Sequence, residues 1–172
     1  MDLLLIIDQI LFLLIILALY IKLRQNNQSF MLIALMFGLM GIITYLSSSV
    51  AFDMLSLSDK YAAATTEAEK TTLVTAGQTM IITWTGTAYD IGYVLLGISF
   101  LITGLVMLRS TEFGKNASYV GIITGILSLV PAFFSLIGLL FAFMSLLPME
   151  IFIILIGLNL VGQDNQHQAK PL

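Results

Sequence analysis

The sequence predicts an all-α protein, a polytopic bundle of transmembrane helices. Of its 172 residues, 59% are apolar and 10% are charged, whereas soluble domains carry about 25% charged residues. Four apolar stretches dominate the chain: residues 3–23, 30–52, 91–108 and 119–161. A helix needs about 20 apolar residues to cross about 30 Å of hydrocarbon, at about 1.5 Å per residue. A soluble protein is therefore excluded, and the chain's first partner is the lipid bilayer.

We expect about five spans in a single bundle domain, residues 1–162. Their approximate ranges are 3–23, 30–52, 87–108, 114–130 and 135–161. The first is interpreted as a retained helix and not a signal peptide, because Asp2 lies where positive charge is expected. The last apolar stretch is long enough to cross twice if the chain turns at Pro131, which cannot donate to a continuing helix. The alternative is one long kinked helix and four spans.

Basic residues predict the orientation, because cytoplasmic loops are enriched in Lys and Arg. They flank the spans at Lys22, Arg24, Arg109 and Lys115, and Lys170 lies in the tail. These places are expected inside the cell and the amino terminus outside. Residues 53–83 then form the outer loop. Residues 163–172 have no apolar period and are expected to be a disordered cytoplasmic tail.

The outer loop is expected to contain one extramembrane helix. Thr66 and Glu69 match a capping box, in which the two side chains satisfy free amide groups at a helix start. Apolar residues recur at helical spacing from there to Trp84, so a helix should begin at Thr66. Its apolar face is expected to lie on the bundle or to run into the third span. Aromatic residues that favour the membrane interface are expected near the outer face: Tyr45, Trp84, Tyr89 and Tyr93.

Small residues form stripes along the later spans, and such stripes mark close helix packing in lipid. The candidate packing residues are Gly38, Gly41, Gly121, Gly125 and Gly138. Gly121 and Gly125 form a Gly-xxx-Gly pair. This pair predicts either dimerisation or internal packing of one bundle, and internal packing is the simpler interpretation.

Three acidic residues lie within or beside the apolar runs: Asp8, Asp90 and Glu150. Such residues usually face a partner or a cavity, because charge is costly in the membrane. Thr83, Thr87 and Tyr93 share a predicted helix face with Asp90, which indicates either an outward polar groove or a wetted carboxylate. Glu150 is expected near mid-membrane and turned into the bundle, as a proton relay or as a hydrogen-bonded carboxyl.

Several function classes find no support in the sequence. No basic patch indicates nucleic acid, and without cysteine there is no thiolate metal site. The only histidine, His167, lies in the tail, so neither a His-based metal site nor a Ser-His pair is expected in the membrane. We predict no catalytic residues, no metal and no cofactor.

Several segments resemble a bacterial membrane family, the domain-of-unknown-function 4386 family. They are Tyr-Ala-Ala-Ala-Thr-Thr-Glu-Ala-Glu at 61–69, Gly-Thr-Ala-Tyr-Asp-Ile-Gly-Tyr-Val at 86–94, Val-Met-Leu-Arg-Ser at 106–110, Tyr-Val-Gly-Ile at 119–122 and Leu-Val-Pro at 129–131. The resemblance runs from about residue 2 to residue 161. It implies a multi-spanning bundle without an assigned activity, in a short form that lacks one or more amino-terminal spans. It brings no catalytic residues.

The expected function is that of a non-enzymatic integral membrane protein with a structural or accessory role. The alternative is a small transporter or an ion- or proton-conducting protein that uses Asp90 and Glu150, and an intramembrane enzyme comes third. We expect a multi-pass protein of the bacterial inner membrane, whose protein partner is a second copy or another membrane protein.

Overall fold

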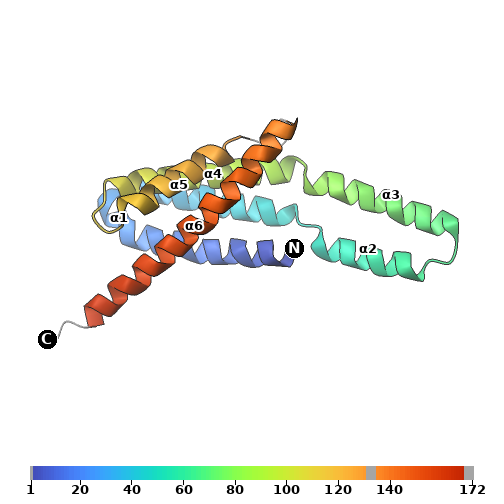
Figure 1. The fold of residues 1–172 in the computed structure, drawn as a ribbon, viewed down its shortest axis with the longest axis horizontal. Helices are drawn as coiled ribbons and strands as arrows, with labels where there is room; N and C mark the ends of the chain where they lie inside the picture. Colours follow the sequence, from blue (N-terminus) through green and yellow to red (C-terminus); the bar gives the residue numbers. More distant parts are fainter. Residues whose placement is uncertain (1, 131–134, 169–172) are drawn as a thin grey trace.

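The computed structural model describes residues 2–130 and 135–168, which form six α-helices and no strand (Figure 1). The helices are α1 Asp2–Ser47, α2 Ala51–Ala63, α3 Glu67–Trp84, α4 Thr87–Leu108, α5 Lys115–Ser128 and α6 Ser135–Gln168. Within the described residues, three helical segments are long and apolar enough to cross a membrane: Ile6–Ala63, Glu67–Leu108 and Leu140–Gly162. The all-α prediction is confirmed, and the count of five spans stays a prediction.

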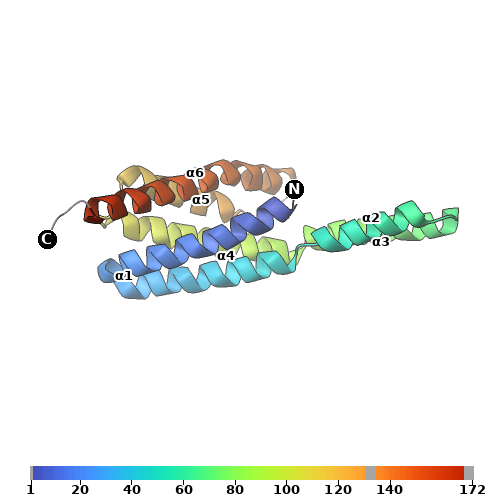
Figure 2. The same ribbon diagram turned by 90° about the horizontal axis from the view of Figure 1, so that it is seen from below.

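Helix α1 is folded back on itself at Asn27. The backbone there is extended, with φ −158° and ψ 91°, and the two arms of α1, residues 2–26 and 28–47, run side by side in opposite directions (Figures 1 and 2). Asn27 Oδ1 accepts a hydrogen bond of 3.2 Å from the amide of Phe30, which caps the second arm. The two predicted amino-terminal spans are therefore separated by a tight turn.

The second arm ends at Ser47, earlier than the predicted end at residue 52. The Ser47 hydroxyl donates to the Thr44 carbonyl at 2.6 Å, and the Ser48 hydroxyl donates to the Tyr45 carbonyl at 2.7 Å. Such local bonds compete with the helix ladder. The serine run, and not the apolar composition, therefore sets the end of the helix.

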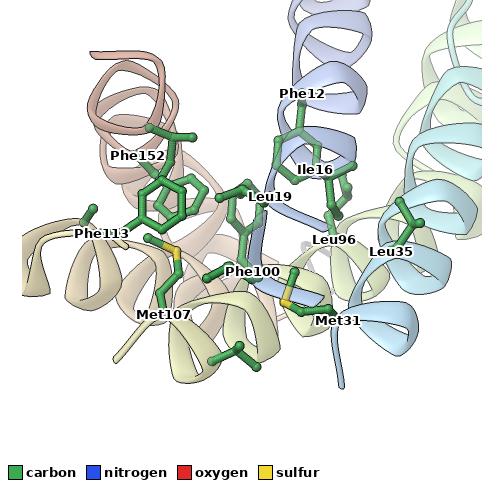
Figure 3. Close-up of a cluster of buried hydrophobic side chains, with 14 of the residues drawn as sticks. Phe12, Ile16, Leu19, Met31, Leu35, Leu96, Phe100, Met107, Phe113 and Phe152 are labelled. Atoms are coloured by element: carbon green, nitrogen blue, oxygen red, sulfur yellow. The ribbon is translucent and has the colours of Figure 1, made fainter. Parts of the chain in front are cut away.

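The core of the bundle lies where α1, α4 and α6 meet (Figure 3). Helix α4 packs between α1 and α5, and α5 in turn packs on α6. The rings of Phe12 and Phe100 stack with centroids 4.5 Å apart, and Phe152 meets Phe100 edge-on at 5.4 Å. The side chain of Phe152 is fully buried. One residue from each of three helices thus fills the centre.

Glycines let α4 approach its neighbours closely. A Cβ on Gly41 would lie 2.9 Å from the backbone nitrogen of Leu96, and one on Gly125 would lie 2.7 Å from that of Leu101. Gly121 faces the ring of Phe152, and a Cβ added to Gly121 would lie 2.7 Å from Phe152 Cε2. The other predicted packing glycines, Gly38 and Gly138, are also buried. Gly121 and Gly125 therefore make close contacts inside one bundle.

Helices α2 and α3 form a hairpin that projects beyond one end of the bundle (Figures 1 and 2). No residue of either helix is buried. The two helices contact each other where Leu57 lies against Gly77. The prediction of a single helix in the outer loop was wrong, because this segment contains two helices, α2 as well as α3. The charged residues of α2 indicated a loop, yet its Ala, Leu, Met and Lys residues are good helix formers that need no core.

The start of α3 follows the prediction. Thr66 Oγ1 accepts from the amide of Glu69 at 3.3 Å, and Glu69 Oε2 accepts from the amide of Thr66 at 3.3 Å, which completes the capping box. Hydrogen bonds from the Thr66 backbone, the Thr66 side chain and the Thr65 backbone lower the pKa of the Glu69 carboxyl. Of the two alternatives for α3, packing on the bundle was wrong, since α3 contacts mainly α2 and only the start of α4. The other alternative is closer, because α3 leads into α4 across Thr85 and Gly86.

The fourth and fifth predicted spans correspond to separate helices. Helices α5 and α6 pack against each other and run in opposite directions, so the alternative of one long kinked helix was wrong (Figure 1). The predicted turn at Pro131 lies outside the described residues. Helix α5 has 14 residues, a length of about 21 Å, which is shorter than the hydrocarbon layer of about 30 Å.

Helix α6 is longer than predicted. It runs through Gln168, so the prediction of disorder from residue 163 was wrong as far as residue 168. Adding a residue to an existing helix costs far less than starting a new one, so an apolar helix can extend into a polar segment. Residues 169–172 lie outside the described part of the chain.

Candidate functional site

The predicted polar face around Asp90 is divided by a helix break. Helix α3 ends at Trp84 and α4 begins at Thr87 after Gly86. Thr83 and Thr87 are exposed, and the Thr83 hydroxyl donates to the carbonyl of Thr79 in its own helix at 3.1 Å. The prediction of one continuous groove was therefore wrong, because Thr83 and Asp90 belong to different helices.

Asp90 and Tyr93 are the members of that face that are buried in the bundle. Asp90 lies in the first turn of α4, where the free amide groups of the helix start favour a negative charge. Tyr93 lies one turn further along and points at α6. Both residues are 8% exposed. The wetted-carboxylate interpretation of Asp90 is also wrong, since the residue is enclosed.

The Tyr93 hydroxyl connects α4 to α6. It lies 2.8 Å from Ser145 Oγ and donates to the carbonyl of Ala142 at 3.2 Å. Ser145 Oγ also donates to the Ala142 carbonyl, at 2.7 Å. Polar groups that bond across helices in this way are stabilising in lipid, where an unmatched group has no water to bond. The network fixes the height at which α6 crosses α4.

Two polar residues of α1, Asp8 and Gln9, belong to the same region as the Tyr93 hydroxyl. Gln9 Nε2 donates weakly to Asp8 Oδ2 at 3.4 Å, and Gln9 is only 4% exposed. Among the described residues, Gln9 Oε1 has no hydrogen-bond partner. Asp8 interacts electrostatically with Glu150 and with Tyr93. We call these five residues the polar layer: Asp8, Gln9, Tyr93, Ser145 and Glu150.

Glu150 belongs to this layer but is exposed, so the prediction that it turns into the bundle was wrong. The buried positions of this part of α6 are Ser145, Met149, Phe152 and Ile156, which recur at helical spacing. Glu150 is one residue beyond Met149 and therefore points away from that face. Its carboxyl still interacts electrostatically with that of Asp8 in the first arm of α1.

A cluster of aromatic rings lies next to the polar layer. Tyr89 contacts Tyr93, Tyr45 and Trp84 with ring centroids 5.5, 5.6 and 6.3 Å apart. The sequence analysis placed all four aromatic residues at one end of the bundle. It did not predict that the Tyr89 ring contacts the other three. Tyr89 therefore links the start of α4 to α1 and to the hairpin.

The polar layer contains two residues that the sequence reasoning missed as site residues, Gln9 and Ser145. Gln9 is an amide inside an apolar run, which is a signal in itself because buried polar groups in membranes are costly. Ser145 belongs to one of the stripes of small residues along the later predicted spans, and such stripes indicate helix packing and not a polar site. Its hydroxyl role depends on the register of α6 against α4, which the sequence does not specify.

The chemistry available to the polar layer is that of carboxyls and neutral hydrogen-bonding groups. Two carboxyls that repel each other favour a shared proton or a bound cation between them. In the described part of the chain, no group of three His, Cys, Asp or Glu side chains is placed to hold a metal ion.

A family model described as a domain of unknown function (DUF4386) matches residues 3–161. No curated protein and no solved structure matches the chain.

Proposed function

Because the chain belongs to the DUF4386 family, which has no assigned function, we propose a role on the basis of the structure. The protein is a non-enzymatic protein of the bacterial inner membrane, and it presents the α2–α3 hairpin to another protein. The observation that carries this proposal is the hairpin. It extends beyond the bundle, and none of its residues is buried. A segment held away from its own core is available for contact with a partner.

The proposed topology has five crossings with the hairpin outside. It is supported by the alternating directions of the two arms of α1, then α4, α5 and α6 (Figure 2). The start of α1 lies near the hairpin, and the end of α6 lies at the opposite end of the bundle (Figure 1). The basic residues at the α1 turn and after α4 lie at that opposite end, which the positive-inside rule assigns to the cytoplasm, together with the tail.

The surface of the hairpin supports a contact role. Exposed apolar side chains occur along both helices, at Phe52, Leu55, Val74, Ile81 and Ile82, and Ile82 is 71% exposed. Phe52, Ile81 and Ile82 lie in the turns next to the bundle, and Leu55 lies one turn further along α2. Val74 lies ten residues before the end of α3, about 15 Å along its axis. Exposed apolar side chains that have no partner in their own chain are typical of protein interaction sites. The partner is a second copy or another membrane protein.

Photo-crosslinking tests this proposal in intact cells. A photoreactive residue at Leu55 or Val74 should capture a protein of defined mass. The matched controls are Ser58 and Thr75, which are exposed polar positions on the same two helices. A captured mass equal to that of the chain would identify a second copy. Equal capture at all four positions, or capture of lipid alone, would contradict the proposal.

A second function, proton or cation conduction, is favoured by one observation. The acceptor Gln9 Oε1 is buried without a partner among the described residues, beside the carboxyl of Asp8 and near that of Glu150. A cation or a hydronium ion bound at Asp8 would give Gln9 Oε1 a partner and offset the repulsion between the two carboxyls. In vesicles that contain the purified protein and a pH-sensitive dye, Glu150→Gln should then abolish a pH-driven flux, whereas Glu112→Gln, an exposed position after α4, should not. Absence of flux in the unaltered protein would exclude this function.

A further inference from the structure

A pocket lies between the turn of α1 and the end of α4, at the end of the bundle opposite the hairpin. Its volume is about 370 Å³, which is within the range of about 300 to 1,000 Å³ that is common for ligand pockets. It is lined by Asn26, Asn27, Phe30, Ile102, Leu105, Val106 and Arg109. None of these residues belongs to the polar layer or to the hairpin.

The lining divides into a polar end and an apolar end. Arg109 is the only charged residue of the lining, and the amides of Asn26 and Asn27 accompany it. Asn27 Oδ1 accepts from the Phe30 amide, so the Asn27 side chain offers its NH₂ group to a ligand. The apolar end includes Phe30 and Leu105, which are 53% and 49% exposed. Donors at one end and apolar side chains at the other match an amphiphile whose head is an anion.

We propose that this pocket binds an anionic phospholipid. The phosphate would lie against the Arg109 guanidinium, which can give two parallel hydrogen bonds to an anion, and the two asparagine amides would add neutral donors. An acyl chain would follow Phe30 and Leu105 toward the centre of the membrane. Basic pockets between transmembrane helices on the cytoplasmic side are known to take anionic headgroups. The charge of the pocket therefore selects the lipid, and its apolar end keeps the lipid in place.

Native mass spectrometry of the whole protein tests the proposal. The protein is purified from vesicles that contain equal amounts of phosphatidylglycerol, which is anionic, and phosphatidylcholine, which is not. The unaltered chain should retain phosphatidylglycerol preferentially, and Arg109→Gln should reduce this preference about fivefold. Arg24→Gln is the matched control, because Arg24 is an exposed arginine at the same end that does not line the pocket. It should keep the preference.

Two further measurements distinguish a lipid held in the pocket from free phosphate and from lipid attracted by surface charge. Leu105→Trp fills the apolar end without changing charge, and it should reduce retention of both lipids. Inorganic phosphate should not displace the retained lipid, and displacement would show that the site binds free phosphate instead. The proposal is overturned if Arg109→Gln leaves the preference intact, as it would if Arg109 only complemented the α4 dipole. It is also overturned if Arg24→Gln has an equal effect, since surface charge alone would then cause the preference.

Discussion

The bundle and the α2–α3 hairpin are both helical, yet different interactions hold them in place. In the bundle, glycines bring backbones together and aromatic rings fill the centre, as at Gly125 and Phe152. In the hairpin, two helices touch with no buried residue, and a capping box at Thr66 satisfies the start of α3. The bundle therefore depends on tertiary packing, whereas the hairpin depends mainly on local interactions.

This difference follows from the surroundings of each region. In lipid, a helix gains nothing by hiding apolar surface, so bundle helices associate through van der Waals contact and hydrogen bonds between helices. The bond from Ser99 Oγ to the Ala34 carbonyl, at 2.8 Å, is one such contact between α4 and α1. On the proposed topology the hairpin lies outside the membrane, where water satisfies its exposed groups and no such bonds are needed. Variants in the two regions should therefore differ in both the size and the reach of their effects.

The largest effect is expected from Gly125→Leu. The new Cβ would lie 2.7 Å from the backbone nitrogen of Leu101 and 2.8 Å from the carbonyl oxygen of Gly97, and backbone atoms cannot move aside as a flexible side chain can. Overpacking commonly costs about 1 to 3 kcal/mol and occasionally more, and a whole leucine at this seam should reach the upper end. Thermal unfolding in detergent, followed by far-ultraviolet circular dichroism, measures the loss. Gly157→Leu is the control because nothing lies within 4 Å of its missing Cβ. Equal losses in both variants would contradict a close-packed seam at Gly125.

A smaller effect is expected from Phe152→Ala, which empties the centre of the bundle. The cost should be about 2 kcal/mol, mainly from the cavity, at about 24 cal/mol per Å³ of unfilled volume. The control is Phe143→Ala on the same helix, since Phe143 is 62% exposed and its loss leaves no cavity. Unfolding in the same detergent compares the two variants. Equal losses of unfolding free energy in the two variants would mean that Phe152 does not hold the helices together. The bundle would then depend on tertiary packing no more than the hairpin does.

The fold class and most helix positions follow from the sequence because they depend on local signals. Apolar length predicts the bundle helices, and the capping box predicts the start of α3 within one residue. The ends of helices were harder to predict. Back-bonding by the Ser47 and Ser48 hydroxyls shortens α1, and continued propagation lengthens α6, and neither effect is visible in hydropathy.

The candidate site was predicted only in part because it depends on how helices register against each other. The sequence identified Asp8, Asp90, Tyr93 and Glu150 as polar residues in apolar surroundings. It did not show that Ser145 meets Tyr93, since that contact depends on where α6 crosses α4. The inward placement of Glu150 failed for the same reason, because the burial of Met149 and Phe152 fixes the rotation of α6.

In the hairpin, Thr66→Ala should have a local effect. It removes the acceptor for the Glu69 amide, and loss of such a cap costs about 1 kcal/mol. Hydrogen exchange should become faster in the first turns of α3 and stay unchanged in α4, because α3 touches only the start of α4. Thr72→Ala is the control, since the Thr72 hydroxyl bonds only to the carbonyl of Ala68 within its own helix. Faster exchange throughout the bundle would show that the hairpin and the bundle unfold as one unit.

The smallest effect is expected from the titration of Glu69, and it tests the same cap without a change of sequence. The backbone and side chain of Thr66 and the backbone of Thr65 hold the pKa of the Glu69 carboxyl below its ordinary value of 4.5. A carboxyl with a lowered pKa in the folded protein stabilises it fully above the ordinary pKa, and this contribution is lost as the pH falls through the folded pKa. Nuclear magnetic resonance of the Glu69 side chain should report the lowered pKa, and exchange of the Thr66 amide should accelerate over that acid range. In Thr66→Ala, the pKa of Glu69 should rise toward its ordinary value because one of its three partners is gone. An unchanged pKa in that variant would mean that the backbone amides alone hold the carboxylate, and the threonine would then contribute to the cap only as an acceptor.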